Sequence, residues 1–226
     1  MKVGIIGSGN IGGALAKYLI DLGHDVVISN SRGPASLIEV ADKTGARAVT
    51  AEEASKAEDL VIISVPENAV PNLPVGNLSV SKAIIVDTGN YYPTRDGKNA
   101  DIDNGLTDSE WVEKVIGHPV IKAFNNIGVT SLEEKGVSKG NTNRIALSVA
   151  GDDAAAKKVV MDLIDDIGFD PVDTGSLAES WRQQPGEGSY CRDLSKEDLS
   201  AALQDADLNK RKENLAYADE IARPYL

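Results

Sequence analysis

Residues 1–20 read MKVGIIGSGNIGGALAKYLI. The apolar run Val3–Ile6 leads directly into a G-x-G-x-x-G pattern formed by Gly7, Gly9 and Gly12, and leucines at helical spacing follow. Strand, glycine turn and helix in this order are typical of a dinucleotide-binding unit. The first glycine permits the tight turn, the second lets a pyrophosphate approach the backbone, and the third lets the helix pack on the strand. Because a helix N-terminus also favours an anion, the stretch predicts a Rossmann-type cofactor site.

The composition narrows the classes of partner. The chain has 226 residues, with 35 acidic and 23 basic side chains and a formal charge of −12. We expect nucleic acid and anionic membranes to repel it, so that any anionic ligand is held by local amides and a few cations. The single cysteine, Cys191, fits a reducing compartment. The first apolar run is only a strand long, and we expect a cytoplasmic protein without leader or membrane span.

The segment after the second predicted strand indicates which dinucleotide binds. NAD-preferring sites usually carry an acidic residue about 20 residues beyond the glycines, at the end of this strand. Here that end reads Ser29-Asn30-Ser31-Arg32, and Asp25 lies at the strand's start. Hydroxyl, amide and guanidinium donors suit a 2′-phosphate, so we predict NADP(H) bound through Asn30, Ser31 and Arg32. The alternative is a polar turn in which Arg32 is merely solvated.

Apolar runs bounded by turn residues predict an α/β fold, a Rossmann-type doubly wound and mainly parallel sheet. The expected strands lie at 3–6, 25–28, 47–49, 60–64, 82–86, 119–124, 145–150 and 169–172. Capping boxes at Thr50 and Thr107 predict helix starts, and Ile38 is expected on the buried side of a helix. We expect an NADP-binding Rossmann domain over 1–175 and a C-terminal loop and helical appendage over 176–226.

Three predicted strands end in polar segments, and ligands of open α/β sheets lie beyond the carboxyl ends of strands. We expect Val65 and Pro66 to flank the adenosine or nicotinamide ribose, and the amides of Asn125 and Asn126 to position the nicotinamide carboxamide. The candidates for the wall of the substrate pocket are Thr88, Gly89, Asn90 and Tyr91. The alternative for this last loop is a turn whose tyrosines pack on the core.

Residues 179–191 are polar and glycine-rich, and two amphipathic segments that predict helices follow them. One interpretation of this tail is a solvated helical appendage. The sharper alternatives are that Trp181, Arg182 and Tyr190 fold over the pocket, or that the helices dock on a partner subunit. Trp181 is therefore a candidate pocket residue.

Several kinds of catalytic pattern are missing from the sequence. It has no Gly-x-Ser-x-Gly turn, no histidine pair at metal-ligand spacing and no cysteine cluster, which disfavours triad hydrolysis and a metal site. His24 and His118 are expected to be structural, and no catalytic residue is assigned. Dehydrogenases that act on alcohols need a proton donor near the carbonyl. Hydride transfer between two ring systems needs mainly alignment, and the sequence favours this second chemistry.

The motifs as a set resemble the NADP oxidoreductases that depend on coenzyme F420, a group that includes the cytosolic NADPH-binding domain of the Steap metalloreductases. The resemblance covers roughly residues 1–175. It rests on Gly7–Gly13, Asn30–Arg32, Ser64–Pro66, Lys122–Asn126 and Ala150–Asp153. In that family NADPH exchanges a hydride with the flat ring of a 5-deazaflavin. The resemblance implies a small-molecule substrate, coenzyme F420 or a flavin as co-substrate, and a homodimer.

The resemblance also implies roles for individual residues. The pyrophosphate would be held by Ser8, Gly9, Asn10 and Ile11, and the 2′-phosphate by Asn30, Ser31 and Arg32. The nicotinamide side would be lined by Val65, Pro66, Ala123 and Asn125. The loop after the fifth strand and residues 180–186 look typical of a bacterial branch, so the hydride acceptor is open.

Two other functions remain open. A relative of the β-hydroxyacid and imine reductases would share the Rossmann half and act on a small carbonyl substrate. Such enzymes usually add a long helical domain that carries a catalytic lysine, and turnover of small hydroxy acids would favour this reading. A non-enzymatic NADPH-binding regulator would bind NADPH tightly without oxidising it.

Overall fold

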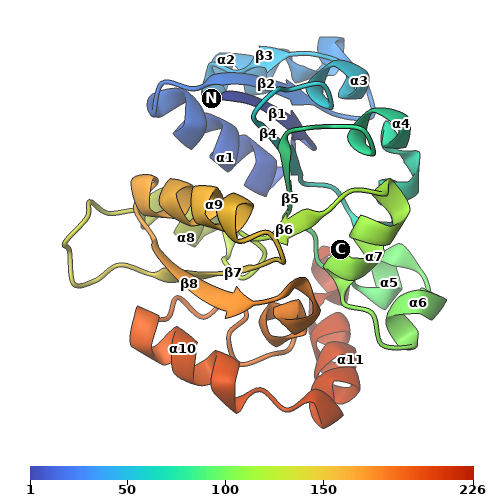
Figure 1. The fold of residues 1–226 in the computed structure, drawn as a ribbon, viewed down its shortest axis with the longest axis vertical. Coiled ribbons are helices and arrows are strands. Elements are labelled where there is room, and N and C mark those ends of the chain that lie inside the picture. Colours follow the sequence, from blue (N-terminus) through green and yellow to red (C-terminus); the bar gives the residue numbers. More distant parts are fainter.

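A single twisted sheet runs through the protein, which is described here for all 226 residues from a computed structural model (Figure 1). Its strands are β1 (Lys2–Ile6), β2 (Asp25–Ser29), β3 (Arg47–Ala48), β4 (Leu60–Ile63), β5 (Ile84–Asp87), β6 (Val120–Lys122), β7 (Ala146–Ala150) and β8 (Asp170–Gly175). Their order is β3-β2-β1-β4-β5-β6-β7-β8. All neighbours are parallel except β6 and β7, which meet antiparallel at Lys122 and Ala150. The predicted doubly wound, mainly parallel sheet is confirmed.

Helices cover both faces of the sheet (Figure 1). The α-helices are α1 (Asn10–Asp21), α2 (Ile38–Thr44), α3 (Ala51–Ala54), α4 (Val75–Leu78), α5 (Pro93–Asp96), α6 (Ala100–Asp103), α7 (Asp108–Ile116), α8 (Val129–Glu134), α9 (Ala154–Asp166), α10 (Lys196–Asp205) and α11 (Arg211–Ala222). The 3₁₀ segments are η1 (Pro34–Leu37), η2 (Glu67–Asn72), η3 (Leu177–Gln183), η4 (Leu208–Lys210) and η5 (Arg223–Tyr225). None of these helices has the length and apolar character that a bilayer crossing requires.

Alternation along the strands divides the core into two layers. Leu60 and Ile62 of β4 pack with α1, α8 and α9, whereas Val61 and Ile63 pack with α3, α4 and α7. Successive strand side chains point to opposite faces, so an uninterrupted apolar run is what a strand covered on both sides requires. This construction leaves the carboxyl edge of the sheet free for loops.

Local signals placed several helices correctly. The capping boxes at Thr50 and Thr107 both form, each with the hydroxyl and the following glutamate bonded reciprocally to backbone N–H groups. The expectation for Ile38 is wrong, because its residue is 64% exposed. The chain turns through η1 before α2 begins, which rotates Leu37 rather than Ile38 onto the core. Helix α8 lies within a polar stretch in which no helix was expected.

The C-terminal residues pack on the antiparallel end of the sheet, where α10 lies beside β8 (Figure 1). Leu199 and Leu203 of α10 are buried against Ala146 of β7 and Val172 of β8. The segment η3 inserts Gln183 so far that none of its surface is exposed. The expected helical C-terminal segment is therefore present, and its first turns reach the carboxyl edge near β6.

Candidate cofactor and hydride-transfer site

The glycine turn at the end of β1 has the geometry that the sequence predicts. Gly7 has φ of 118°, and a Cβ there would lie 1.9 Å from the Ser64 carbonyl oxygen. A Cβ on Gly12 would lie 2.0 Å from the Gly7 carbonyl oxygen. Since no side chain fits either contact, both positions require glycine. The two contacts fix the start of α1 against the end of β1 and the loop after β4.

The entrance to α1 is open to an anion. Gly9 is the N-cap residue, no side chain bonds to the first turn, and a Cβ on Gly9 would meet nothing within 4 Å. The first N–H groups of a helix have no partner inside it, so those of Asn10 and Ile11 face available space. Ser8 lies beside them, half-buried. These residues could hold a pyrophosphate.

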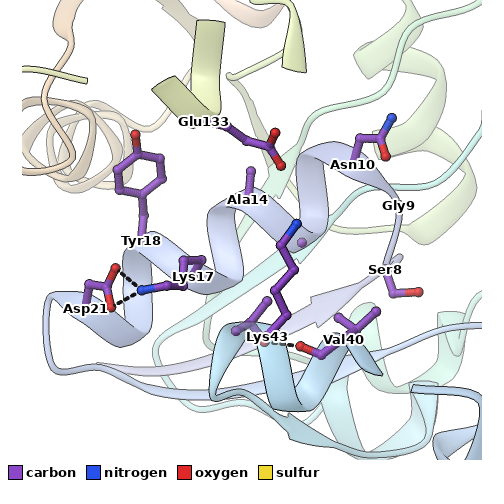
Figure 2. Close-up of a pocket in the computed structure, with 12 residues that line it drawn as sticks. Ser8, Gly9, Asn10, Ala14, Lys17, Tyr18, Asp21, Val40, Lys43 and Glu133 are labelled. Atoms are coloured by element: carbon purple, nitrogen blue, oxygen red, sulfur yellow. Dashed lines mark hydrogen bonds and ion pairs between the residues drawn. The ribbon is translucent and has the colours of Figure 1, made fainter. Parts of the chain in front are cut away.

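A cavity of about 570 Å³ continues from this turn along the outer side of α1. Figure 2 shows Ser8, Gly9 and Asn10 where the helix begins, with Lys43 reaching from α2 and Glu133 from α8. Lys17 and Asp21 form an ion pair at the far end. The cavity shares the glycine turn with the predicted cofactor site, but its remaining lining belongs to the surface between α1, α2 and α8.

Asn30 joins the first two loops at the carboxyl edge. Its Oδ1 accepts a hydrogen bond from the Arg32 backbone N–H at 2.9 Å, and its Nδ2 donates to Ser36 Oγ at 3.0 Å. A longer contact of 3.4 Å runs from Nδ2 to Ser8 Oγ. Ser31 and Arg32 are exposed, and the guanidinium makes no ion pair or hydrogen bond within the chain. This corner therefore presents hydroxyls, an amide and an uncommitted cation.

Ser36 is a residue that the sequence interpretation missed. Its hydroxyl donates to the Gly33 carbonyl oxygen at 2.8 Å and lies 3.2 Å from Asn30 Oδ1. The available signal was a serine three residues after a glycine, a pattern that forms hydroxyl-to-backbone turns. It stands within the same cluster of donors as Asn30.

The loop after β5 is anchored rather than free. The Thr88 backbone N–H and hydroxyl both bond to the Ile63 carbonyl oxygen, and Gly89 is buried. Tyr91 is 1% exposed, its hydroxyl donates to the Gly97 carbonyl oxygen at 2.9 Å, and the Asn99 N–H donates to that hydroxyl at 3.1 Å. Asn90 alone keeps a half-buried side chain at this edge. The structure thus places the Tyr91 ring inside the protein and Asn90 at the rim.

Asn125 at the end of β6 binds two distant loops. Its Nδ2 donates to Asn90 Oδ1 at 3.0 Å and to the Gln183 carbonyl oxygen at 2.8 Å, while its Oδ1 accepts from Gln183 Nε2 at 2.9 Å. The side chain is buried and both amide protons are used. Phe124, one residue earlier, has φ of 62°, a strained value for a residue with a side chain. The chain is therefore held in a turn of unusual conformation at this point.

Asn126 contacts the segment that follows η3. Its carbonyl oxygen accepts from the Cys191 N–H at 3.0 Å, and its side-chain Oδ1 is buried without a hydrogen-bond partner. Tyr190 lies beside this contact, with its hydroxyl 2.9 Å from that of Tyr92. Burial raises the pKa of the Tyr190 hydroxyl well above its usual value. Both phenols are neutral near neutral pH.

The remaining candidates occupy the same edge with different exposure. Val65 is half-buried and Pro66 is exposed after β4, and Ala123 is fully buried beside Asn125. Trp181 is 5% exposed, and the Arg182 guanidinium stacks 4.6 Å from the centre of its ring. Trp181 therefore lies under Arg182.

Beneath these loops lies a buried group of charges that the sequence interpretation did not anticipate. Lys122 of β6 is 0% exposed and Asp87 of β5 is 1% exposed, with Lys122 Nζ 3.1 Å from Asp87 Oδ2. The signals were a lysine within the apolar run 119–124 and an acidic residue closing the run 82–86. No group of three or more histidine, cysteine or acidic side chains is arranged to hold a metal ion.

Comparison with known proteins assigns the chain to a family. Residues 2–91 match the family described as "NADP oxidoreductase coenzyme F420-dependent". A solved structure of a hypothetical protein from Sinorhizobium meliloti is 34% identical, with a TM-score of 0.73, over 87% of this chain and 96% of that one. The chain belongs to the F420-dependent NADP oxidoreductase family. The resemblance found in the sequence is thereby confirmed.

Two further proteins are similar to this chain over most of its length. The chain is 29% identical to metalloreductase STEAP3 of Rattus norvegicus over 180 residues, which are 79% of this chain and 35% of that protein. A proposed F420-dependent NADP reductase from an Arthrobacter species shares the fold, at 24% identity and a TM-score of 0.66, over 80% of this chain and 87% of that one. The chain is also 58% identical to the protein YjhV of Escherichia coli over 55 residues, which are 24% of this chain and 40% of that protein. The matches thus span less than half the length of these two curated relatives.

Proposed function

We propose that the protein is an NADP(H)-dependent oxidoreductase that passes a hydride between NADPH and the flat ring of a deazaflavin or flavin. The observation that carries the proposal is the contact between Asn30 and Ser8. This contact joins the glycine turn, whose free N–H groups suit a pyrophosphate, to the end of β2, whose hydrogen-bond donors suit a 2′-phosphate. Bound NADPH would supply the hydride.

The cofactor preference rests on the end of β2. A 2′-phosphate needs several donors and a cation, and Arg32 offers a guanidinium that no carboxylate of the chain neutralises. Asn30, Ser31 and Ser36 supply the neutral donors around it. The nearest acidic residue of β2, Asp25, is at the opposite end of the strand, where it pairs with Lys2 in the sheet register. Arg32 would therefore strengthen the binding of NADPH, which carries the 2′-phosphate, and contribute little to the binding of NADH.

The proton donors at the carboxyl edge support a ring system as the hydride acceptor. Lys122 is enclosed with Asp87, the Tyr91 hydroxyl is bonded within its own loop, and Tyr92 and Tyr190 bond to each other. Reduction of a small carbonyl requires a positioned acid, and these groups are committed elsewhere. A ring acceptor requires alignment against the nicotinamide. The family's description, which names coenzyme F420, supports this class of acceptor.

The loops of the carboxyl edge would provide that alignment. The Asn90–Asn125 pair fixes the ends of β5 and β6 relative to each other, and the Gln183–Asn125 hydrogen bonds attach η3 to the end of β6. A rigid wall built from three segments can hold two rings face to face and exclude water, which is what ring-to-ring hydride transfer asks of a protein.

The test is stopped-flow oxidation of NADPH in the presence of coenzyme F420, FMN, FAD or riboflavin, with the cyclic imine pyrroline-5-carboxylate and a small 3-oxo acid as controls. We expect oxidation with at least one ring acceptor, faster with NADPH than with NADH. Oxidation with the imine or the 3-oxo acid alone would support a reductase of the β-hydroxyacid and imine type. Tight NADPH binding without oxidation by any acceptor would indicate a binding protein.

A further inference from the structure

A cluster of four ionisable side chains lies directly beneath the loop that carries Asn90. We call it the buried charge cluster, and it consists of Glu67, Asp87, Asp108 and Lys122. The side chains come from η2, β5, α7 and β6, and each residue is at most 2% exposed. Three carboxyl groups thus share one ammonium in a space that water does not reach.

Two of the three carboxyl groups have strong partners. Asp87 accepts from Lys122 Nζ at 3.1 Å and from the Ser109 hydroxyl at 2.6 Å. Asp108 accepts from the Tyr91 backbone N–H at 3.0 Å. Lys122 Nζ also donates to the Gly89 carbonyl oxygen at 2.6 Å, so the ammonium holds the loop backbone as well as the carboxylate. These contacts tie the loop to the cluster.

Glu67 differs from its neighbours because neither of its carboxyl oxygens has a hydrogen-bond partner, although the residue is 1% exposed. The group lies against the loop backbone: a Cβ built on Gly89 would be 2.6 Å from Glu67 Oε1 and 3.0 Å from Asp87 Oδ1. Glu67 and Asp87 therefore both approach Gly89 at the position that a side chain would occupy. Two ionised carboxylates this close, without water between them, repel strongly.

The surroundings of Glu67 leave it no cation of its own. Asp87 faces it from β5, Lys122 from β6, Asp108 from α7 and Asp96 from α5. Lys122 is bonded to Asp87, and the Arg95 guanidinium beside Asp96 pairs with Asp96 at 2.8 Å. An isolated buried charge is so unfavourable that a carboxyl group in this position takes up a proton instead. Burial, followed by the charge of Asp87, raises the pKa of Glu67 well above its ordinary value.

We propose that Glu67 is a positioning residue for the hydride-transfer site, held in its neutral, protonated form against Gly89, and that loss of this proton displaces the loop bearing Asn90. The inference rests on the proposed function for its effect on hydride transfer. The protonation of Glu67 itself is inferred from the buried charge cluster and does not depend on the proposed function. The cluster then consists of the Asp87–Lys122 ion pair, Asp108 bonded to the Tyr91 backbone N–H, and a neutral Glu67, and the loop packs on these groups.

Deprotonation has a defined mechanical consequence. An ionised Glu67 would be repelled by Asp87, which lies at the same position beside Gly89, and would compete for the Lys122 ammonium. Lys122 is also the donor to the Gly89 carbonyl oxygen, so a shift of the ammonium releases the loop. Asn90 would move away from Asn125, while the glycine turn and Arg32, which lie on other loops, would keep their places.

The direct test is infrared difference spectroscopy on the full-length protein, comparing wild type with Glu67→Gln and Glu67→Met. We expect the wild type at neutral pH to show the carbonyl stretch of a protonated carboxylic acid, absent from both variants. Glu113→Gln is the matched control, since burial also raises the pKa of Glu113, at the opposite end of the sheet. The band should persist in that control. Its persistence in Glu67→Gln and Glu67→Met would overturn the proposal.

The pH dependence of unfolding provides a second readout that requires no acceptor. A carboxyl group that keeps its proton in the folded state but ionises near pH 4.5 in the unfolded state makes stability fall as the pH rises above that value. Glu67→Gln removes this contribution, so its advantage over wild type should grow from about pH 4.5 upwards until the folded protein also releases the proton. Identical pH profiles for the two proteins would contradict a protonated Glu67.

The functional readout separates positioning from binding. At saturating NADPH, we expect the wild-type hydride-transfer rate constant to fall up to about tenfold per pH unit once Glu67 ionises, while the rate of Glu67→Gln stays level. The Kd for NADPH should stay within about twofold in both proteins. A level wild-type rate, or equal falls in wild type and variant, would overturn the role of Glu67. If no ring acceptor is reduced at all, the proposed function fails, and the infrared and unfolding experiments still decide the protonation of Glu67.

Discussion

The side-chain amide of Asn125 donates to Asn90 Oδ1 at 3.0 Å, and the Asn90 amide returns a hydrogen bond to the Asn125 carbonyl oxygen at 3.1 Å. This reciprocal pair joins the ends of β5 and β6 at the carboxyl edge of the sheet. Because Asn125 also bonds twice to Gln183, one amide determines how three segments meet. The wall of the proposed hydride-transfer site depends on this arrangement.

Replacing Asn125 by Asp should therefore destabilise the protein. A carboxylate cannot donate to Asn90 Oδ1 or to the Gln183 carbonyl oxygen, and both acceptors would face a buried negative charge. We expect a loss of at least about 1–3 kcal/mol in the free energy of unfolding, measured in urea. Asn126→Asp is the control, because the Asn126 amide makes only a 3.4 Å contact. Equal losses at the two positions would show that the Asn90–Asn125 pair is not special.

Arg32→Ala should discriminate between the two nicotinamide cofactors. The guanidinium is exposed and unpaired within the chain, so its removal should leave folding unchanged. We expect NADPH binding to weaken by about 1–3 kcal/mol, the range for hydrogen bonds to charged groups, and NADH binding to be spared. Isothermal titration calorimetry with both cofactors measures this, with Arg47→Ala, an exposed arginine on β3, as control. Equal weakening for NADPH and NADH would remove Arg32 from the 2′-phosphate.

Gly12→Ala and Gly13→Ala form a matched pair on α1. The new Cβ at position 12 would lie 2.0 Å from the Gly7 carbonyl oxygen, whereas at position 13 it would meet nothing within 4 Å. We expect Gly12→Ala to cost at least about 1–3 kcal/mol of stability, as overpacking typically does, and to weaken NADPH binding. Gly13→Ala should retain or raise stability, because alanine favours helix. Similar thermal unfolding of the two variants would be incompatible with the close approach of α1 to β1.

The Lys122–Asp87 pair should behave as a buried ion pair. Lys122→Met leaves Asp87 without its cation, and breaking one side of such a pair typically costs about 3–5 kcal/mol. Adding Asp87→Asn removes the stranded charge while an oxygen remains to accept from the Gly89 N–H, so the double variant should recover a large part of that loss. The free energies of unfolding in urea of wild type, the two single variants and the double variant provide a double-mutant cycle. Additive losses would mean that the two side chains do not interact.

Much of the fold could be predicted because its signals are local. Apolar runs defined the parallel strands, the glycine pattern defined the turn before α1, and the capping boxes at Thr50 and Thr107 defined two helix starts. The exposure of Ile38 could not be predicted from the apolar pattern. The 3₁₀ turn over 34–37 precedes the helix and changes which residue faces the core, and the spacing of apolar residues does not show this turn. Helix α8 was not predicted because its sequence has no clear apolar stripe.

The site could be predicted only in part, for a physical reason. The glycine turn and the end of β2 are continuous stretches, whereas the buried charge cluster joins Glu67, Asp87 and Lys122 from three separate strands or turns. The bond from Gln183 to Asn125 spans 58 residues. Such pairings depend on how the sheet brings the ends of its strands together. A short stretch of sequence carries no information about this arrangement. The roles assigned to Thr88, Tyr91 and Trp181 at the substrate pocket remain predictions.

The central claim is hydride transfer from NADPH to a ring acceptor, and isotope transfer tests it most directly. The enzyme would be incubated with NADPH carrying deuterium on the reactive carbon of the nicotinamide, in separate preparations for its two faces, together with oxidised coenzyme F420. Mass spectrometry of the reduced deazaflavin, whose acceptor carbon retains the label, reads out the result. The account predicts one deuterium in the product from one labelled face and none from the other. Labelled NADPH that binds but leaves coenzyme F420 oxidised and unlabelled, or a reduced product without deuterium from either face, would contradict direct hydride transfer to this ring.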